Sequence, residues 1–438
     1  MTTTHPHQRI VLLGLVLLSL GARFAVLKDN LWRLGEDVDD YLRLAENLSE
    51  WGTFGSEDGP TAYRPPLYPM LLAPAYWLQR TLVLAWGWRL MAIAFPHLCL
   101  GAGTAVLTWR AAKKLDLQDW SILAGVLVAI DPLLLHHCRL AMTETLAAFL
   151  FAAGSNLLLS SDSGSRPMRT IAAGFVLGLG MLCRTTLWSF TAVAVFAAVL
   201  FRPTARSDRV KWAGLLLTAA LAVQAPWTVR NWIALGRPVL TTTHGGYTLL
   251  LGNNDVFYDE VIETSWSRTW PGDSLSDWQE QVHRESGAGS ELEYNSFCYR
   301  LAWDTIRSRP RDFLLSIGYR IVSFWRFAPR ETEYYRWWVR LGCALFYVPE
   351  LLLMIIGVAG RRAWRWPGVL LPTALLSFTL VHAVYWSDMR MRATIMPAVA
   401  ILAAMGMERV TGLFNRQPGG GTLKVGELNG GTVKRLNC

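Results

Sequence analysis

Long apolar runs separated by polar connections fill most of the chain. The run from Ile171 to Phe201 is the longest and carries Arg184 near its middle, so we expect two short spans that break near Cys183–Thr186. The other runs have about the twenty residues that cross a bilayer and lie at 9–27, 84–109, 119–136, 139–160, 211–230, 340–360, 366–386 and 392–413. The pattern predicts an all-α polytopic membrane protein with about 10–11 transmembrane helices and two large extracytoplasmic loops.

Basic residues in the short connections predict the orientation of these spans. They follow the second span at Arg110, Lys113 and Lys114 and the sixth at Arg202, Arg206, Arg209 and Lys211. The positive-inside rule places these connections in the cytoplasm. The loops 28–83 and 231–312 then face outward, so we expect a multi-pass protein of the cell inner (plasma) membrane whose site faces the periplasm or exterior.

Two segments do not fit the span pattern. The stretch 313–327 is apolar but short and flanked by arginines, so it is a span or an interfacial helix, and we favour the interfacial helix. Residues 416–438 contain GGG and GG repeats without apolar periodicity, which is typical of a disordered end, here cytoplasmic. We expect residues 1–415 to form one transmembrane domain.

Composition supports a membrane protein and excludes other classes. Hydrophobic residues make up 52% of the chain and charged residues only 17%, too few for the surface of a soluble protein of this size. The 21 tryptophans suit the two lipid–water boundaries. Basic residues in the connections between the spans account for the net charge of +9. The sequence has no basic stripe with interleaved aromatic residues, the pattern that would indicate nucleic-acid binding. We therefore expect the lipid bilayer to surround the protein.

Metal and redox chemistry have weak support in the sequence. The six cysteines are scattered, without metal-ligand or redox spacing. His136, His137 and His244 lack the carboxylate–histidine spacing of a metal site. We expect no certain cofactor; a divalent metal stays open but is not favoured.

The first outer loop carries the most specific pattern. It has an acidic start at Asp37, and Tyr41, Leu44, Ala45 and Leu48 then recur at helical spacing on one apolar face. An Arg-Pro-Pro-Leu-Tyr element follows at 64–68. A capped amphipathic helix and a rigid loop would explain each part separately. Their combination after a single span is more specific than either part.

These elements, in this order, resemble the bacterial members of the protein O-mannosyltransferase superfamily, which are glycosyltransferase family 39-like and have the GT-C membrane fold. The aminoarabinose transferase that acts on lipid A is a relative with the same layout. Asp37, Tyr41 and Ala45 match the group's acid–aromatic–small pattern, but Val38 stands where many members have a second acid. The basic-Pro-Pro-Leu-Tyr element of the group matches residues 64–68.

The resemblance extends over most of residues 10–412. Thr143-Glu144 matches a hydroxyl–Glu step, and Leu182-Cys183-Arg184 is similar to Leu-Thr-Arg. Gly252-Asn253-Asn254 follows in the second outer loop. Arg390-Met391-Arg392 is similar to an Arg-Tyr-Arg element, with Met391 in place of the aromatic residue.

The resemblance implies a membrane glycosyltransferase that moves a sugar from a polyprenyl-phosphate donor to an envelope acceptor, which is a protein, a lipid or a polysaccharide. Asp37 is the expected base for the attacking hydroxyl. Arginines are expected to hold the phosphate. One base and one displacement imply inversion at the anomeric carbon. The expected substrate-binding residues are Tyr41, Arg64, Tyr68, Glu144, Arg184, Asn253, Arg390 and Arg392.

Structural roles remain open for several of these residues. Ionisable groups inside spans, such as Glu144 and Arg184, face a cavity or each other. Asn253 beside a glycine is typical of a turn. Arg390 and Arg392 suit interfacial anchors. At Asp39 and Asp40 the pattern favours a solvated face over a catalytic role.

The main alternative function is a polytopic transporter or lipid flippase of the cell envelope. It predicts broken helices at matching positions of two halves and charges near the midplane. In this chain the charges gather at the outer helix ends and in the outer loops, which favours chemistry at the outer surface.

Overall fold

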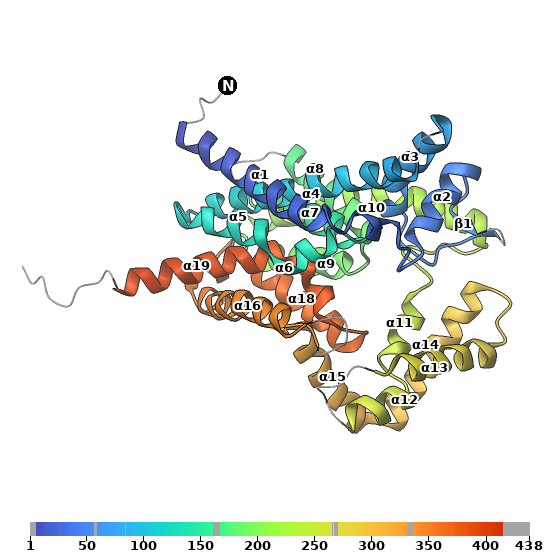
Figure 1. Cartoon of the computed structure of the whole chain (residues 1–438). Coiled ribbons are helices and arrows are strands. Elements are labelled where there is room, and N and C mark those ends of the chain that lie inside the picture. Colours follow the sequence, from blue (N-terminus) through green and yellow to red (C-terminus); the bar gives the residue numbers. More distant parts are fainter. Residues whose placement is uncertain are drawn as a thin grey trace, which may run out of the picture.

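The computed structural model describes residues 6–56, 59–83, 85–160, 167–264, 266, 270–330 and 336–414. The predicted tail at 416–438 lies outside these residues. In the described part the chain is helical, apart from one antiparallel pair of two-residue strands, β1 (Gly55–Ser56) and β2 (Gly59–Pro60) (Figure 1).

The helices confirm the all-α polytopic class. Six helical segments in the described ranges are long and apolar enough to span a bilayer: α1 (Pro6–Leu27), α4 (Trp86–Lys114), α5 with α6 (Trp120–Ile130 and Pro132–His137), α10 (Arg206–Leu235), α16 (Trp337–Val358), and η3 with α19 (Met389–Ile395 and Met396–Phe414). Shorter apolar helices are α7 (Glu144–Leu158), α8 (Pro167–Cys183), α9 (Leu187–Phe201) and α18 (Leu370–Val384), and a four-residue helix, α17 (Arg361–Trp364), precedes α18. Together they cover every span that the apolar pattern predicts.

The chain leaves helical geometry where polar residues meet the apolar runs. The long run breaks between Cys183 and Leu187, as expected from Arg184. The fourth span begins at Glu144, later than the predicted residue 139, because residues 138–143 form turns after α6. Both irregular segments contribute to the candidate site.

The first outer loop packs as a folded unit on the end of α4. It contains η1 (Leu31–Gly35), α2 (Tyr41–Trp51) and α3 (Leu67–Thr81). Leu42, Tyr68 and Leu72 are buried in one apolar cluster with Leu90 of α4. The loop is therefore held rigidly over the helix ends.

The second outer loop forms a lobe that Figure 1 shows extending away from the bundle. It is built of α11 (Gly245–Leu251), α12 (Asp255–Phe257), a π-helical turn η2 (Tyr258–Ile262), α13 (Gly272–Ser286), α14 (Glu291–Ser308) and α15 (Pro310–Phe324). Phe257, Trp270 and Trp278 are buried in its own aromatic core. The 15-residue α15 covers most of 313–327 and is not among the candidate spans; the interfacial position favoured for it stays a prediction.

The helix α19 lies at the centre of the bundle. In its apolar window 78% of the residues are buried, against 22% for α1 and for α16. It packs most closely on α16, where a Cβ at Gly406 would lie 1.9 Å from the carbonyl oxygen of Leu353, and one at Gly357 would lie 2.0 Å from that of Leu402. Only glycine permits this backbone approach, which holds the middle of α19 against the C-terminal end of α16.

Candidate functional site

A polar pocket of about 390 Å³ lies where the two outer loops meet the helix ends. Its walls come from the first loop, the start of α7, the α8–α9 break, the start of the second loop, α14, the end of α18 with the turn after it, and η3. The polar side chains of the lining are Asp39, Tyr41, Arg64, Thr143, Arg184, Thr185, Thr186, Ser189, Thr241, Thr242, His244, Thr248, Tyr299, His382, Tyr385 and Arg390.

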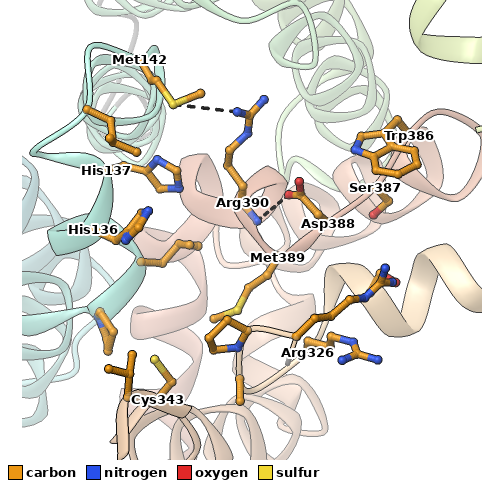
Figure 2. Close-up of a pocket in the computed structure, with 18 of the residues that line it drawn as sticks. His136, His137, Met142, Arg326, Cys343, Trp386, Ser387, Asp388, Met389 and Arg390 are labelled. Carbon is orange, nitrogen blue, oxygen red and sulfur yellow. Dashed lines mark hydrogen bonds between the residues drawn. The ribbon is translucent and has the colours of Figure 1, made fainter. Parts of the chain in front are cut away.

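Arg390 connects Asp39, which lines this pocket, with Glu144, which is buried behind the lining. Its Nη1 lies 3.4 Å from Oδ2 of Asp39, and its Nε lies 3.3 Å from Oε1 of Glu144. Its backbone N–H donates to Oδ1 of Asp388 at 2.8 Å, the N-cap contact that starts η3 (Figure 2). The cap and the central α19 therefore hold this guanidinium in place.

Glu144 is the buried counter-ion of the site. Its side chain is 1% exposed, and Oε1 accepts from Nη1 of Arg184 at 2.9 Å. Arg184 also donates to Oγ1 of Thr143 at 3.3 Å. A buried carboxylate is tolerated when cations and hydrogen bonds compensate it. Glu144 thus orients two arginines and is itself largely withdrawn from the pocket.

Asp39 lies between two guanidinium groups and borders the pocket. Its Oδ1 accepts from Nη2 of Arg64 at 3.1 Å, opposite the contact of Oδ2 with Arg390. The Arg64 guanidinium also lies over the ring of Tyr41, with 5.7 Å to the centroid, and over that of Tyr63, at 5.3 Å. Asp39 keeps 19% of its side chain exposed, so an incoming hydroxyl can reach it.

His244 adds a neutral hydrogen-bonding group. Burial, and then the charges of Arg64 and Arg390, lower the pKa of His244 to about 3. Nη1 of Arg64 donates to Nε2 at 3.4 Å, which leaves the proton on Nδ1. Nδ1 is buried and has no hydrogen-bond partner among the described residues. His244 therefore leaves one buried N–H without a partner in the wall of the pocket.

The charges of this cluster favour an anionic ligand. Among the lining residues three guanidinium groups, Arg64, Arg184 and Arg390, face one carboxylate, Asp39, and His244 is neutral. Guanidinium groups pair well with phosphate oxygens. The pocket thus combines an excess of positive charge with one accessible carboxylate, which is the pairing that transfer from a phosphate ester requires.

The structure brings four of the predicted substrate-binding residues into the pocket lining: Tyr41, Arg64, Arg184 and Arg390. Glu144 lies directly behind them. Asp37, the predicted base, points elsewhere: Oδ1 accepts from the backbone N–H of Leu42 at 3.1 Å and Oδ2 from that of Arg43 at 2.8 Å. It does not line the pocket, because it caps the start of α2.

Three further predicted residues lie outside the pocket lining. Tyr68 is fully buried behind Tyr41, and its hydroxyl pairs with Nε2 of His97 at 2.9 Å. Asn253 accepts from the Tyr258 hydroxyl and from Arg320, which holds the lobe together. Arg392 is fully buried, and its Nη1 donates to the carbonyl oxygen of Phe324 at 2.8 Å. Each makes contacts that position neighbouring elements.

The residues that sequence reasoning missed are Asp39 and His244. Asp40 adopts a left-handed backbone with φ 64°, which interrupts the helical phase between Asp37 and Tyr41. Asp37 therefore faces the helix start while Asp39 faces the arginines. No spacing rule signals that turn, since Asp40 is not a glycine. The sequence could not pair His244 with Arg64, because the two residues are far apart along the chain and meet only in the fold.

Among the residues that the structure describes, no group of three or more His, Cys, Asp or Glu side chains is arranged to hold a metal ion. The polar pocket presents guanidinium and carboxylate groups.

Comparison with known families gives a partial match. The family model for dolichyl-phosphate-mannose-protein mannosyltransferases matches residues 69–229, which is less than half of the chain. These residues include Glu144 and Arg184. No curated protein sequence matches the chain.

Solved structures match over nearly the whole chain. The oligosaccharyltransferase AglB from Archaeoglobus fulgidus, in complex with an inhibitory peptide and a dolichol-phosphate, matches with TM-score 0.58 and 14% identity over 94% of this chain and 51% of that one. A second structure of an A. fulgidus oligosaccharyltransferase, tethered to an acceptor peptide, matches with TM-score 0.55 and 12% identity over 92% and 50%. ArnT from Cupriavidus metallidurans bound to undecaprenyl phosphate gives TM-score 0.44 and 13% identity over 93% and 79%.

These similarities show the fold. The chain has the membrane fold of the archaeal oligosaccharyltransferases, which confirms the predicted GT-C architecture. It spans about half the length of these oligosaccharyltransferases.

Proposed function

We propose that the protein is a membrane glycosyltransferase that moves a sugar from a polyprenyl-phosphate donor to an acceptor hydroxyl. The observation that carries this proposal is Asp39, accessible from the pocket and held between Arg64 and Arg390. The partial match to the mannosyltransferase family and the dolichol-phosphate bound to AglB support a lipid-linked phosphate as the donor chemistry.

In this mechanism the arginines bind the donor phosphate and Asp39 is the base. The acceptor oxygen forms a bond to the anomeric carbon while its proton passes to the Asp39 carboxylate. The bond between that carbon and the phosphate oxygen breaks, and the polyprenyl phosphate leaves with the electron pair. Arg64, Arg184 and Arg390 stabilise the growing charge. A single displacement inverts the anomeric centre.

This proposal moves the catalytic role from Asp37 to Asp39. Both oxygens of Asp37 accept backbone N–H groups of α2 and are aimed away from the arginines. A base needs to be within hydrogen-bond reach of the proton that it removes. Only Asp39 of the two meets that condition for a ligand in the pocket.

The site would face the periplasm or exterior. The predicted cytoplasmic residues gather at the other end of the spans: Nζ of Lys114 donates to the carbonyl oxygen of Asn156 at 2.8 Å, and Arg169 donates to that of Ser160 at 3.0 Å. Arg9, Arg110 and Lys113 lie together there. The positive-inside rule assigns this end to the cytoplasm.

Three single variants in lipid nanodiscs test the proposal. Each is incubated with a panel of polyprenyl-phosphate sugars and envelope lipids and proteins, and mass spectrometry follows the released carrier phosphate. We expect Asp39→Asn to lower the transfer rate by about 10²–10⁴-fold, the usual contribution of a general base. The matched control Asp40→Asn, at an exposed ion pair with Arg43, should transfer at the wild-type rate.

Asp37→Asn separates the two assignments. It should lose roughly 0.5–2 kcal/mol of stability through the weakened helix cap and retain transfer within a few-fold. If the Asp39→Asn protein kept its transfer activity and the Asp37→Asn protein lost it, the assignment of Asp39 as the base would be refuted. A transporter or flippase would bind the donor without releasing carrier phosphate from any of these proteins.

A further inference from the structure

The segment 61–64 of the first outer loop is held by residues that lie outside this loop. Glu291, in the first turn of α14, accepts with Oε1 from the backbone N–H of Ala62 at 2.9 Å and with Oε2 from the hydroxyl of Thr61. Arg230 of α10 donates to the carbonyl oxygen of Thr61 at 2.6 Å. Both oxygens of the Glu291 carboxylate are thus used on a distant part of the chain.

The hold on Thr61 continues through the residues that lead to Arg64. The hydroxyl of Thr61 accepts from the backbone N–H of Tyr63 at 2.9 Å while it donates to the carboxylate on α14. Ala62 is fully buried, and its carbonyl oxygen accepts from the backbone N–H of Thr243 at 3.0 Å. The backbone is therefore fixed at each of the three residues before Arg64.

The start of α14 does not need Glu291 as a cap. Ser290 is the N-cap residue, and its hydroxyl accepts from the backbone N–H of Glu293 at 3.3 Å. The carboxylate of Glu293 reaches back to the backbone N–H of Gly289 at 2.9 Å. Ser290 and Glu293 thus satisfy the beginning of the helix between them. The contact of Glu291 with the first outer loop is additional to helix capping.

Arg64 enters the polar pocket directly from the held segment. Its guanidinium contacts Oδ1 of Asp39 at 3.1 Å and lies over the ring of Tyr63, 5.3 Å from the centroid. A displacement of about 1 Å in a group that positions a substrate can cost about 10²-fold in rate. A shift of the backbone at residues 61–63 would therefore carry this guanidinium away from a phosphate bound in the pocket.

We propose that Glu291 is a positioning residue for Arg64, so that the second outer loop takes part in binding the donor phosphate without touching it. The inference rests on the proposed function, in which Arg64 binds that phosphate. Glu291 does not line the polar pocket. It holds Thr61 and Ala62, and this hold presents Arg64 to the pocket.

The first test measures the binding of undecaprenyl phosphate, as a polyprenyl phosphate, to the full chain in lipid nanodiscs. We expect Glu291→Gln to weaken binding about tenfold, the size of one charge-assisted hydrogen bond to the phosphate. The amide nitrogen of the variant cannot accept from a backbone N–H, so one contact with the loop is lost. Glu293→Gln, in the same turn of α14, should bind as wild type. Unchanged binding by Glu291→Gln, or equal weakening by both variants, would overturn the inference.

A double-mutant cycle asks whether the effect passes through Arg64. In the Arg64→Gln background, Glu291→Gln should weaken binding by less than about twofold, because the residue that it positions is already gone. In the Arg184→Gln background the effect of about tenfold should remain, since Arg184 is held by Glu144 on α7. The same loss in both backgrounds would indicate a general distortion of the site and would refute the positioning role.

Thr61 provides a second pair of variants, which decides the matter even if Glu291→Gln does not fold. Thr61→Ser keeps the hydroxyl that Glu291 binds, so this protein should bind undecaprenyl phosphate as wild type does. Thr61→Val removes the hydroxyl and should weaken binding about tenfold, but only in proteins that retain Arg64. An equal loss in Thr61→Ser and Thr61→Val would contradict the proposed contact.

These binding measurements separate the positioning role from the proposed function. If wild type released no carrier phosphate with any donor sugar, the proposed transfer would fail, while the dependence of phosphate binding on Glu291 and Arg64 would still be measured. If wild type transferred sugar and Glu291→Gln transferred it equally fast, only the positioning role would be refuted. A wild-type protein that did not bind undecaprenyl phosphate would overturn both.

Discussion

At the scale of single residues, the site depends on charges that compensate one another. Glu144 is buried between Arg184 and Arg390, and Asp39 is held between Arg390 and Arg64. Removing one member of such a buried set leaves the others without compensation. Glu144 is therefore expected to stabilise the bundle and, in the proposed function, to affect the binding of an anion.

Glu144→Gln is expected to lower stability by roughly 3–5 kcal/mol, the usual cost of breaking a buried pair. Because Arg184 and Arg390 then lack an anion, added polyprenyl phosphate should raise the melting temperature of the variant more than that of wild type. Thermal unfolding in detergent with and without the lipid measures both effects. A variant as stable as wild type would show that Glu144 is not the counter-ion of these arginines.

His244 makes a pH-dependent contribution. Its pKa in the folded protein is about 3, below the unfolded value of about 6.5. Above the unfolded value both states are neutral; as the pH falls below it, the unfolded state takes up a proton that the folded state does not, so stability is lost. Melting temperatures measured from about pH 7 to pH 4 should therefore fall less for His244→Gln than for wild type. If the melting temperatures of the two proteins fell equally with pH, the buried, uncharged state of His244 would be contradicted.

The residue scale is also where the sequence was least informative. The acidic stretch and the arginine of the Arg-Pro-Pro element were visible as candidates. Which acid reaches the arginines depends on the backbone of Asp40, whose φ is 64°. No residue type in the acidic stretch predicts this left-handed conformation. Arg392 is two residues from Arg390 but buried against α15, because η3 is a tight 3-10 turn that directs the two side chains differently.

At the scale of elements, apolar periodicity predicted the spans because a bilayer demands long apolar runs with internally satisfied backbones. The same pattern, interrupted by Arg184, also predicted the break between Cys183 and Leu187. It did not predict the turns at 138–143 or the helices of the second loop, where tertiary contacts between aromatic residues decide the structure.

The α16–α19 pair allows a direct test of element packing. Gly357→Val would place side-chain atoms against the backbone of Leu402, whereas Gly342→Val on the same helix meets nothing within 4 Å. We expect Gly357→Val to cost roughly 1–3 kcal/mol or more through overpacking, and Gly342→Val to have little effect. Thermal unfolding of the two purified proteins makes the comparison; equal stabilities would rule out the close approach.

At the scale of the whole molecule, polar chemistry and basic connections lie at opposite ends of the bundle. Glu50 is exposed on the first loop, and Arg206 is exposed at the start of α10. In a variant without the six native cysteines, a membrane-impermeant maleimide should label Glu50→Cys in intact cells. Arg206→Cys should be labelled only after permeabilisation. The reverse result would place the site in the cytoplasm.

The central place of α19 has a consequence for how the protein is made. Synthesis proceeds from the N-terminus, so the most buried of the described spans is also the last of them to leave the ribosome. Until it is made, Arg390 is absent, and Asp39 and Glu144 each lack one of their cationic partners. The polar pocket is therefore complete only after η3 and α19 have been added to the other described helices.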